Sequence, residues 1–570
     1  MLEINKRKAW FLLLFLFLFY LTNNYVWLNS KGSFGDGPDM ISHLKTTISI
    51  YPKLLSLINP GIGESRLDNL IKILQFSQWW PPMIYINAAI FYLFFGLSNL
   101  VVQMSNIVFF LILIVSTYLI GRELKDDNNG MLAAFLISFY PVTFGLSRNF
   151  GIDFPLTAMV SLGIFFLIKT DGFTSRKYSL LFGIVSGLGI LTKWAYLLFI
   201  LGPLFYTLFA FPPEIENVKI KRGKIYNLLF VFLLVFSISY IWASSHWRFI
   251  FEFGWPRLTA NYLPKDALSK YDNEHLMTSL INEPIGIKIF SREWFLFYIF
   301  HILNNISIFF SIVFIISSIV FVRFAGDRKK KLILIWIIFS YLFFTFCSLK
   351  VGRYYVPVLP AIAVISAFGI QEIKTNLLRK GLIIVIVLVG IFQFYRLSFD
   401  FMSRFPLRFI YIHNVVHPLF KSPSSDIIGT YAFPPRVTNF EDTAVSLGKE
   451  MIADYQGVTP MSVMIKSGYG ERENIYYFLC LHYPSARIVI WNNDYNPDEA
   501  GSFDYLITIQ AIDSGRPEYG LFDLCSSKGN FSNEKNIKPK NIFEKEYTRI
   551  LAKHQIFPGG THVYLVGHKS

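Results

Sequence analysis

The feature that most constrains this chain is a series of apolar runs separated by short basic clusters. A helix that crosses a bilayer needs about 20 mainly apolar residues, fewer if protein shelters its ends. We read eleven such runs, at residues 10–27, 100–120, 131–146, 154–168, 178–191, 194–211, 226–242, 294–322, 332–348, 355–370 and 381–394. With 53% hydrophobic and only 16% charged residues, the 570-residue chain is not an ordinary soluble protein. The pattern predicts an α-helical polytopic membrane protein with about eleven transmembrane helices.

Basic residues precede the first run and follow every second run after it. The clusters lie at residues 6–8, 122–125, 176–177, 219–224, 328–331 and 374–380. Cytoplasmic loops carry the excess of Lys and Arg, so we expect the N-terminus in the cytoplasm and the C-terminal region outside. The first run lacks a small-residue cleavage pattern and is expected to stay as an anchor. This topology accounts for the net charge of +15, and no nucleic-acid partner is expected.

The remaining segments suggest three parts. Residues 1–398 form the predicted membrane domain, and its first outer loop, 28–99, is too long for a plain connector. Segments 66–76 and 85–97 of this loop predict helices that lie in the membrane interface, separated by "QWWPP". An interfacial linker is expected at 399–424, and 425–570 predicts an extracytoplasmic α/β domain. This domain has expected helices at 441–456 and 473–483, strands at 461–465, 486–491 and 503–509, and a closing edge strand at 561–568.

Charged residues recur at the outer ends of different predicted helices. They are Asp36, Asp39, Arg148, Asp153, Lys193, Lys350 and Arg353. Charged groups buried at the ends of membrane helices are costly and tend to be functional. We therefore expect these side chains to meet in one pocket that opens away from the cytoplasm.

Four stretches carry a family resemblance: "WWPPMIYINAAIFYLFFGL", "STYLIGREL", "SFYPVTFGLSRNFGIDFPLTAM" and "GIVSGLGILTKWAYLLF". In this order they resemble the GT-C superfamily of membrane glycosyltransferases, in particular protein O-mannosyltransferases and lipid A aminoarabinose transferases. The resemblance runs through about residues 8–370. It implies transfer of a sugar from a polyprenyl-phosphate donor to a lipid, glycan or protein acceptor at the extracytoplasmic face, with membrane lipids as neighbours.

The resemblance also implies roles for the acids. The family carries an Asp in the first outer loop as catalytic base or metal anchor, and both Asp36 and Asp39 fit a variant of that motif. Asp153 matches an acid that relatives carry at the start of the fourth span. The ordinary alternative is a helix N-cap, for Asp36 or Asp39 before a helix that begins near Met40 and for Asp153 before Pro155.

The cations would hold the carrier's phosphate. Lys193 matches the family's Thr-Lys, and Lys350 and Arg353 match its Lys-x-x-Arg-Tyr-x-x-Pro pattern, while Arg148 is a further candidate. A lipid phosphate leaves as an anion, so such a site needs fixed cations and one carboxylate to accept a proton. The alternative for each cation is a side chain that extends to lipid headgroups.

Other readings stay open. The sequence identifies no certain cofactor, and a divalent metal ion on Asp39 and His43 is an alternative, since carboxylate oxygens and imidazole nitrogens are common ligands. Cys480 and Cys525 could pair in an oxidising compartment. A transporter or flippase, or a polymerase of lipid-linked saccharides, would also gather charges in a membrane protein. However, the chain shows no internal repeat, and its acids lie in the first outer loop.

Overall fold

The structure is a computed structural model. It describes residues 6–30, 38–60, 65–76, 80–210, 218–250, 290–347, 351–410, 440–454, 461–466, 471–483, 486–490, 505–510, 549–555 and 562–567. The chain divides into two compact units. The first consists of Met1–Trp27, Ile50–Phe91 and Gln103–Pro434, and the second of Leu28–Ser49, Tyr92–Val102 and Pro435–Ser570. The expected linker at 399–424 and the boundary after it lie mostly outside the described residues.

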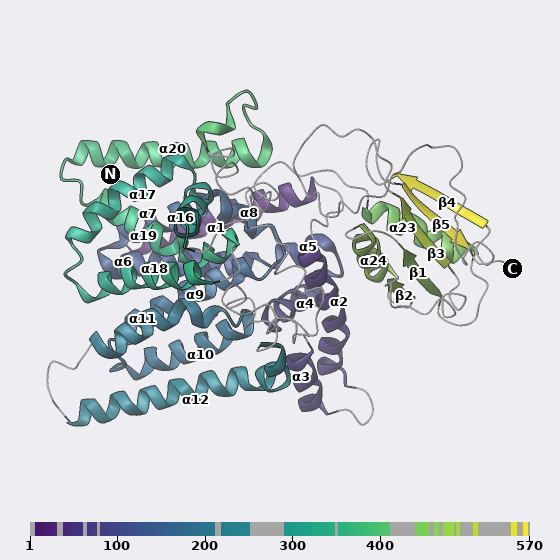
Figure 1. Cartoon of the computed structure of the whole chain (residues 1–570), viewed down its shortest axis with the longest axis horizontal. Helices are drawn as coiled ribbons and strands as arrows, with labels where there is room; N and C mark the ends of the chain where they lie inside the picture. The colour runs from purple at the N-terminus through teal and green to yellow at the C-terminus, as the bar shows by residue number, and fades with distance from the viewer. Residues whose placement is uncertain are drawn as a thin grey trace. The chain divides into compact units, whose positions relative to one another are not determined.

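The first unit is a bundle of helices (Figure 1). Its helices include α1 (Lys6–Asn29), α3 (Arg66–Gln75), α6 (Ile107–Leu124), α7 (Asp127–Phe139), α8 (Pro141–Ser147), α9 (Asp153–Lys169), α10 (Arg176–Thr192), α11 (Tyr196–Ala210), α12 (Val218–Phe249), α16 (Arg292–Ile306), α17 (Ile308–Arg323), α18 (Arg328–Phe346), α19 (Leu359–Gln371) and α20 (Asn376–Phe399), with 3-10 helices η3 (Gly352–Val358) and η4 (Leu407–Phe409). Each of the eleven apolar runs coincides with one helix or with two consecutive helices.

Small residues let the central helices approach closely. Helix α6 packs against α7 and α9, and α19 packs against α7 and α17. A Cβ added at Gly121 of α6 would lie 2.8 Å from the Cα of Gly130 on α7. At Gly130 itself it would meet the carbonyl oxygen of Tyr118. Close packing through small residues is typical of membrane helices.

Two of the predicted runs are broken. The run at 131–146 bends by 67° between α7 and α8, where Tyr140 is extended because Pro141 follows it. The run at 294–322 bends by 119° between α16 and α17, where Ser307 has a φ of 77°. At 29 residues this second run exceeds the length of one straight span.

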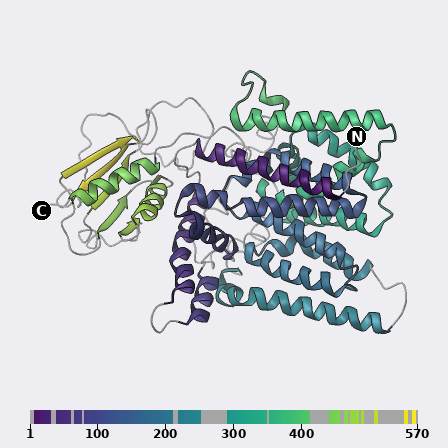
Figure 2. The ribbon, with the colours of Figure 1, turned by 180° about the vertical axis from the view of Figure 1, so that it is seen from behind.

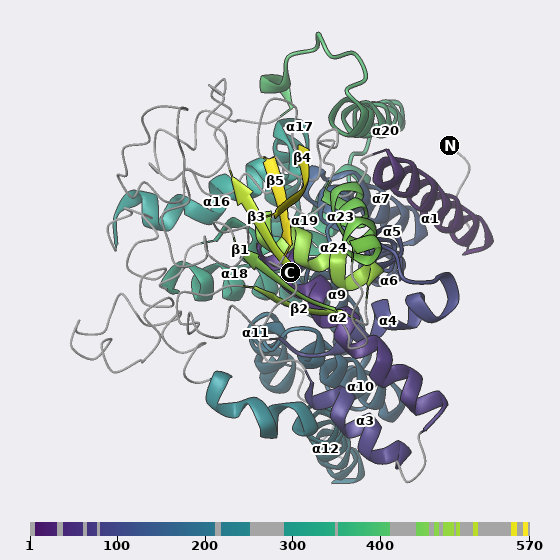
Figure 3. The same cartoon turned by 90° about the vertical axis from the view of Figure 1, so that its right-hand side faces the viewer.

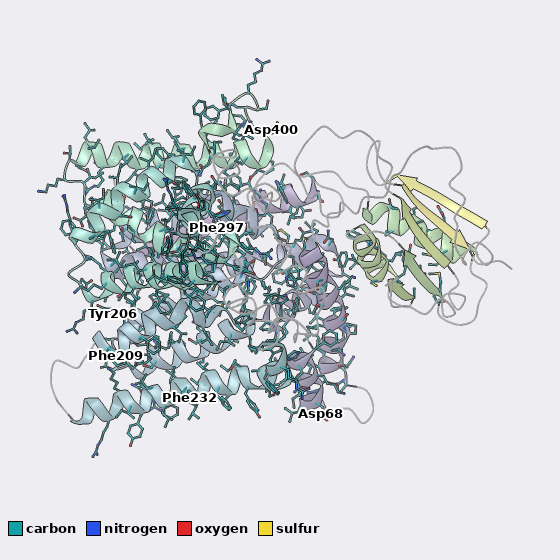
Figure 4. The ribbon with its side chains drawn as sticks, viewed as in Figure 1. Asp68, Tyr206, Phe209, Phe232, Phe297 and Asp400 are labelled. Atoms are coloured by element: carbon teal, nitrogen blue, oxygen red, sulfur yellow. The ribbon has the colours of Figure 1, made fainter. Side chains whose placement is uncertain are left out.

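The chain is a multi-pass membrane protein. By length and composition, the described residues contain five helices that can cross a membrane, or up to seven if each bent pair is one span. Apolar side chains cover the outside of the bundle. Phe209 of α11 is 80% exposed and Phe232 of α12 is 64% exposed, and both lie at its periphery (Figure 4). Figures 1 and 2 show that α12 runs alongside α10.

The segment predicted to be the first outer loop, 28–99, contains several helices among its described residues. The predicted helices at 66–76 and 85–97 are present as α3 and α4 (Met83–Phe95). Helix α2 (Pro38–Ile58) precedes them and α5 (Asn99–Met104) follows them. Helix α2 begins at Pro38, so Asp39 lies in its first turn rather than at the N-cap.

The C-terminal segment contains a mixed five-stranded sheet (Figure 3). Its elements are α23 (Phe440–Asp454), β1 (Ser462–Lys466), α24 (Glu471–His482), β2 (Arg487–Ile490), β3 (Tyr505–Gln510), β4 (Arg549–Gln555) and β5 (His562–Gly567), and the strand order is β2-β1-β3-β5-β4. Strand β1 pairs in parallel with β2 and β3, whereas β5 pairs antiparallel with β3 and β4. The expectation of an edge strand at 561–568 is wrong, because β4 pairs with the free side of β5 and forms that edge.

The contact between α6 and α7 yields a stability prediction. Gly130→Ala should destabilise the protein by about 1–3 kcal/mol, because its methyl group overpacks the contact with Tyr118. Thermal unfolding of the detergent-solubilised protein measures the effect. Gly381→Ala in α20 is the control, because an added Cβ there meets nothing within 4 Å. Equal melting temperatures for the two variants would contradict this account of the packing.

Candidate functional site

Asp153 is the first residue of α9, and the N-cap position belongs to Ile152. The N-cap alternative therefore does not describe Asp153. Its backbone carbonyl accepts a 2.8 Å hydrogen bond from the side-chain hydroxyl of Thr157, one turn further along the helix. Negative charge is favourable at a helix N-terminus. The carboxylate itself contacts two cations.

Each oxygen of this carboxylate faces a different cation. Lys193 Nζ lies 2.7 Å from Asp153 Oδ1, and Arg353 Nε lies 3.4 Å from Asp153 Oδ2. Three predicted site residues are thus brought together from α9, from the turn after α10 and from η3. Two cations and one carboxylate leave one net positive charge, so the arrangement can attract an anion. We call Asp153, Lys193 and Arg353 the charge cluster.

Lys193 is the most enclosed member of the charge cluster. It is the C-cap of α10, where positive charge is favourable, and its side chain is 8% exposed, against 12% for Asp153 and 38% for Arg353. Its ammonium group lies 5.3 Å from the ring centroid of Trp80 and 5.2 Å from that of Tyr354. Aromatic faces attract a cation at this distance. Lys193 is therefore fixed by a carboxylate and two rings.

Arg353 lies on η3, which packs against α9, α16 and α18. Tyr355 anchors η3, because its hydroxyl donates a 2.9 Å hydrogen bond to the carbonyl of Ile337 on α18. The Tyr355 ring also lies 5.6 Å from the ring of Tyr298 on α16. Arg353 thus extends from an anchored segment, and its guanidinium can present a fork of donors to an oxyanion.

Arg148 has a different environment. It is fully buried, and it donates 2.9 Å hydrogen bonds to the side chains of Asn24 on α1 and Ser398 on α20. Its guanidinium lies over three rings, those of Trp27, Phe144 and Phe394, at 4.8, 5.5 and 5.3 Å. These contacts join α1, α8 and α20, which suits a residue that holds helices together.

The other predicted residues are described less fully. Asp36 and Lys350 lie outside the described residues, and Asp39 is placed only as part of α2. His43, also on α2, is 4% exposed, and its carbonyl accepts a 3.0 Å hydrogen bond from the hydroxyl of Thr47. The pairing of Cys480 with Cys525 is likewise untested, because Cys525 lies outside the described residues.

A metal ion does not fit the charge cluster. Both carboxylate oxygens of Asp153 already face cations, which would repel a divalent ion. Among the described residues, no group of three or more His, Cys, Asp and Glu side chains has a metal-binding arrangement. The alternative of a metal ion on Asp39 and His43 stays a prediction, because the side chain of Asp39 lies outside the described part of the structure.

Sequence reasoning missed the aromatic partners of Lys193. Trp80 belongs to "QWWPP", read only as a separator between helices, and Tyr354 follows Arg353 directly. The available signal was that Trp80 lies in one of the four stretches that carry the family resemblance, and Tyr354 in the motif that carries Lys350 and Arg353. Nothing in the spacing of Trp80 and Lys193, which are 113 positions apart, indicated a contact.

Known proteins share this arrangement of helices. The model of the family "Dolichyl-phosphate-mannose-protein mannosyltransferase" matches residues 80–242. The crystal structure of ArnT from Cupriavidus metallidurans in the apo state superposes with a TM-score of 0.57 at 10% identity, covering 98% of each chain. The structure of the same protein bound to undecaprenyl phosphate gives 0.55 at 11% identity, covering 97% of each. The chain has the GT-C fold. This finding confirms the resemblance seen in the sequence.

The segment that the family model matches includes part of the charge cluster. Residues 80–242 contain Trp80, Asp153 and Lys193, whereas Arg353 lies beyond the matched segment. A relative from Aquifex aeolicus (strain VF5), named only as an uncharacterized protein, is 24% identical over 416 residues, which are 69% of this chain and 70% of that protein.

The charge cluster predicts an order of stability among variants. Asp153→Asn leaves Lys193 and Arg353 facing each other without a carboxylate, whereas Lys193→Met leaves Asp153 paired with Arg353. Removing one partner of a buried pair costs about 3–5 kcal/mol, so Asp153→Asn should destabilise strongly and more than Lys193→Met. Thermal unfolding in detergent measures both. An unchanged melting temperature for Asp153→Asn would show that the cluster is not electrostatically coupled.

Proposed function

We propose that this protein is a membrane glycosyltransferase that moves a sugar from a polyprenyl-phosphate donor to a lipid, glycan or protein acceptor at the extracytoplasmic face. The observation that carries the proposal is the charge cluster, in which two cations outnumber the single carboxylate. The GT-C fold supports it, as does the fact that a protein of this fold, ArnT, has been crystallised with undecaprenyl phosphate.

The reaction needs little from the protein beyond positioning and charge. An acceptor oxygen or nitrogen attacks the anomeric carbon, the bond from this carbon to the phosphate oxygen breaks, and polyprenyl phosphate leaves with the electron pair. A carboxylate of the first outer loop, Asp36 or Asp39, accepts the acceptor's proton. Fixed cations stabilise the negative charge that grows on the phosphate.

The contacts suggest a division of roles among the cations. Arg353 is the most exposed member of the charge cluster and makes the longer contact to Asp153, so it is best placed to turn toward a phosphate. Lys193 is held by Asp153 and two rings and supplies fixed positive charge. Lys350 would add a further charge from the same motif. Arg148, surrounded by rings and hydrogen-bonded to α1 and α20, would act through helix packing.

The proposed topology has eleven spans, a cytoplasmic N-terminus and a C-terminal α/β domain outside. The match of all eleven apolar runs with helices supports the count, and the alternation of basic clusters supports the orientation. The five-stranded sheet with α23 and α24 would be that outer domain, where contact with an acceptor is its simplest role.

Release of the carrier tests the proposal. Purified protein is supplied with polyprenyl-phosphate sugars and an acceptor extract, and free polyprenyl phosphate is measured. Arg353→Ala should lower the release rate by on the order of a hundredfold, because a preorganised charge contact is lost. Arg353→Lys should recover part of the rate, since lysine keeps the charge but not the fork.

The matched control is Arg404→Ala, because Arg404 is an exposed arginine of the same unit. It should leave the rate unchanged. Full activity of Arg353→Ala would contradict the role of Arg353. The proposed function itself would be contradicted if the unmodified protein released no free polyprenyl phosphate from any of the polyprenyl-phosphate sugars supplied. Transport of the intact lipid-linked sugar would favour a flippase.

The base is tested by separate Asp36→Asn and Asp39→Asn variants in the same assay. One should be inactive and the other nearly intact, because a single carboxylate accepts the proton. Asp68→Asn is the control, because Asp68 is exposed on α3 of the same outer loop (Figure 4). Two active variants would show that the base lies elsewhere.

A further inference from the structure

We infer that His301 and Gly352 are positioning residues for Arg353. Neither belongs to the charge cluster, and the inference rests on the proposed function only in naming the phosphate as the ligand. Gly352 is the first residue of η3 and precedes Arg353, and His301 lies on α16. Their contact fixes how far Arg353 reaches toward Asp153 and the phosphate.

The contact leaves no room for a side chain at residue 352. A Cβ built on Gly352 would lie 2.5 Å from His301 Nδ1, 2.9 Å from Cε1 and 3.0 Å from Cγ. Real Cβ atoms do not approach other atoms this closely, so a methyl group must move either the imidazole ring or η3. Glycine is thus required here by close approach rather than by an unusual backbone angle.

The imidazole ring has little freedom to move. His301 is 8% exposed, and its ring centroid lies 4.3 Å from that of Phe297, one turn earlier on α16. Protein interiors are packed so densely that an added methylene is felt by its neighbours. The displacement caused by a methyl group would therefore pass largely to η3.

The rest of η3 is held by contacts with α16 and α18. Tyr355 is 1% exposed, its hydroxyl bonds the Ile337 carbonyl, and its ring contacts Tyr298. Arg353 lies between this anchor and the contact of Gly352 with His301. A shift of Gly352 against a fixed Tyr355 must therefore change the direction of the Arg353 side chain.

The contact of Arg353 with Asp153 is sensitive to such a change. Its Nε to Oδ2 distance is 3.4 Å, already long for a charge-assisted hydrogen bond, whereas Lys193 approaches to 2.7 Å. A shift of η3 moves Arg353 directly, whereas Lys193 extends from the end of α10. Arg353 is thus the member of the cluster that depends most on its support.

The test adds a methyl group and then removes the ring that it meets. Gly352→Ala should weaken binding of undecaprenyl phosphate by about tenfold and slow transfer by on the order of a hundredfold, because a small misplacement of a binding group is costly. Gly352→Ala combined with His301→Ala should restore much of both, because the space is reopened. Normal binding by Gly352→Ala, or a double variant no better than Gly352→Ala, would overturn the inference.

Gly369→Ala separates positioning from loss of packing. An added Cβ at Gly369 of α19 would run into the backbone and side chain of Ser317 on α17, a clash of similar severity away from η3. It should lower the melting temperature as Gly352→Ala does but leave the affinity for undecaprenyl phosphate unchanged. Equal loss of affinity in both glycine variants would show a general effect of stability.

A readout without ligand keeps the inference testable if the proposed function fails. The melting temperatures of Asp153→Asn, Arg353→Ala and their combination give the coupling between the two residues. This coupling should be present in the unmodified background and absent in the Gly352→Ala background. Coupling that persists with Gly352→Ala would overturn the positioning role whatever the ligand is.

Discussion

One carboxylate shared by two cations joins three segments that are far apart in the sequence. Asp153 starts α9, Lys193 ends α10, and Arg353 lies on η3. Buried charges are tolerated only when each has a partner with good geometry. The ends of these segments must therefore stay close together, and the packing of the helices that carry them keeps them in place. The arrangement also leaves an excess of positive charge, which can attract a phosphate group.

The support of the charge cluster is mostly apolar and aromatic. Trp80 and Tyr354 enclose the Lys193 ammonium, while Tyr355 and the contact of Gly352 with His301 hold η3. Arg148 of the same unit contacts three aromatic rings and donates hydrogen bonds to two polar side chains. Charged residues in this unit thus have two kinds of environment. Arg353 of the charge cluster is 38% exposed, whereas Arg148 is fully enclosed by the protein itself.

Much of this fold could be predicted from the sequence, because apolar length and basic clusters reflect the bilayer directly. The residues Asp153, Lys193 and Arg353 could be selected because charge at the end of an apolar run is rare and costly. The bend at Ser307, the partners of Arg148 and the contact of His301 with Gly352 could not. Each depends on which helix faces are adjacent, and uniformly apolar helices carry little information about their facing sides. Strand β4 was missed because "RILAKHQ" lacks a strong alternating pattern.

The most direct test of the central claim is to compare the binding of undecaprenyl phosphate and undecaprenol, the same lipid without its phosphate, to the purified protein. If the charge cluster holds the phosphate group, undecaprenyl phosphate should bind more tightly than undecaprenol by on the order of tenfold or more. The reason is that charge-assisted hydrogen bonds to the phosphate are stronger than neutral ones to a hydroxyl group. Arg353→Glu, which reverses one charge of the cluster, should abolish this difference. Equal affinities for the phosphate and the alcohol in the unmodified protein would contradict the account.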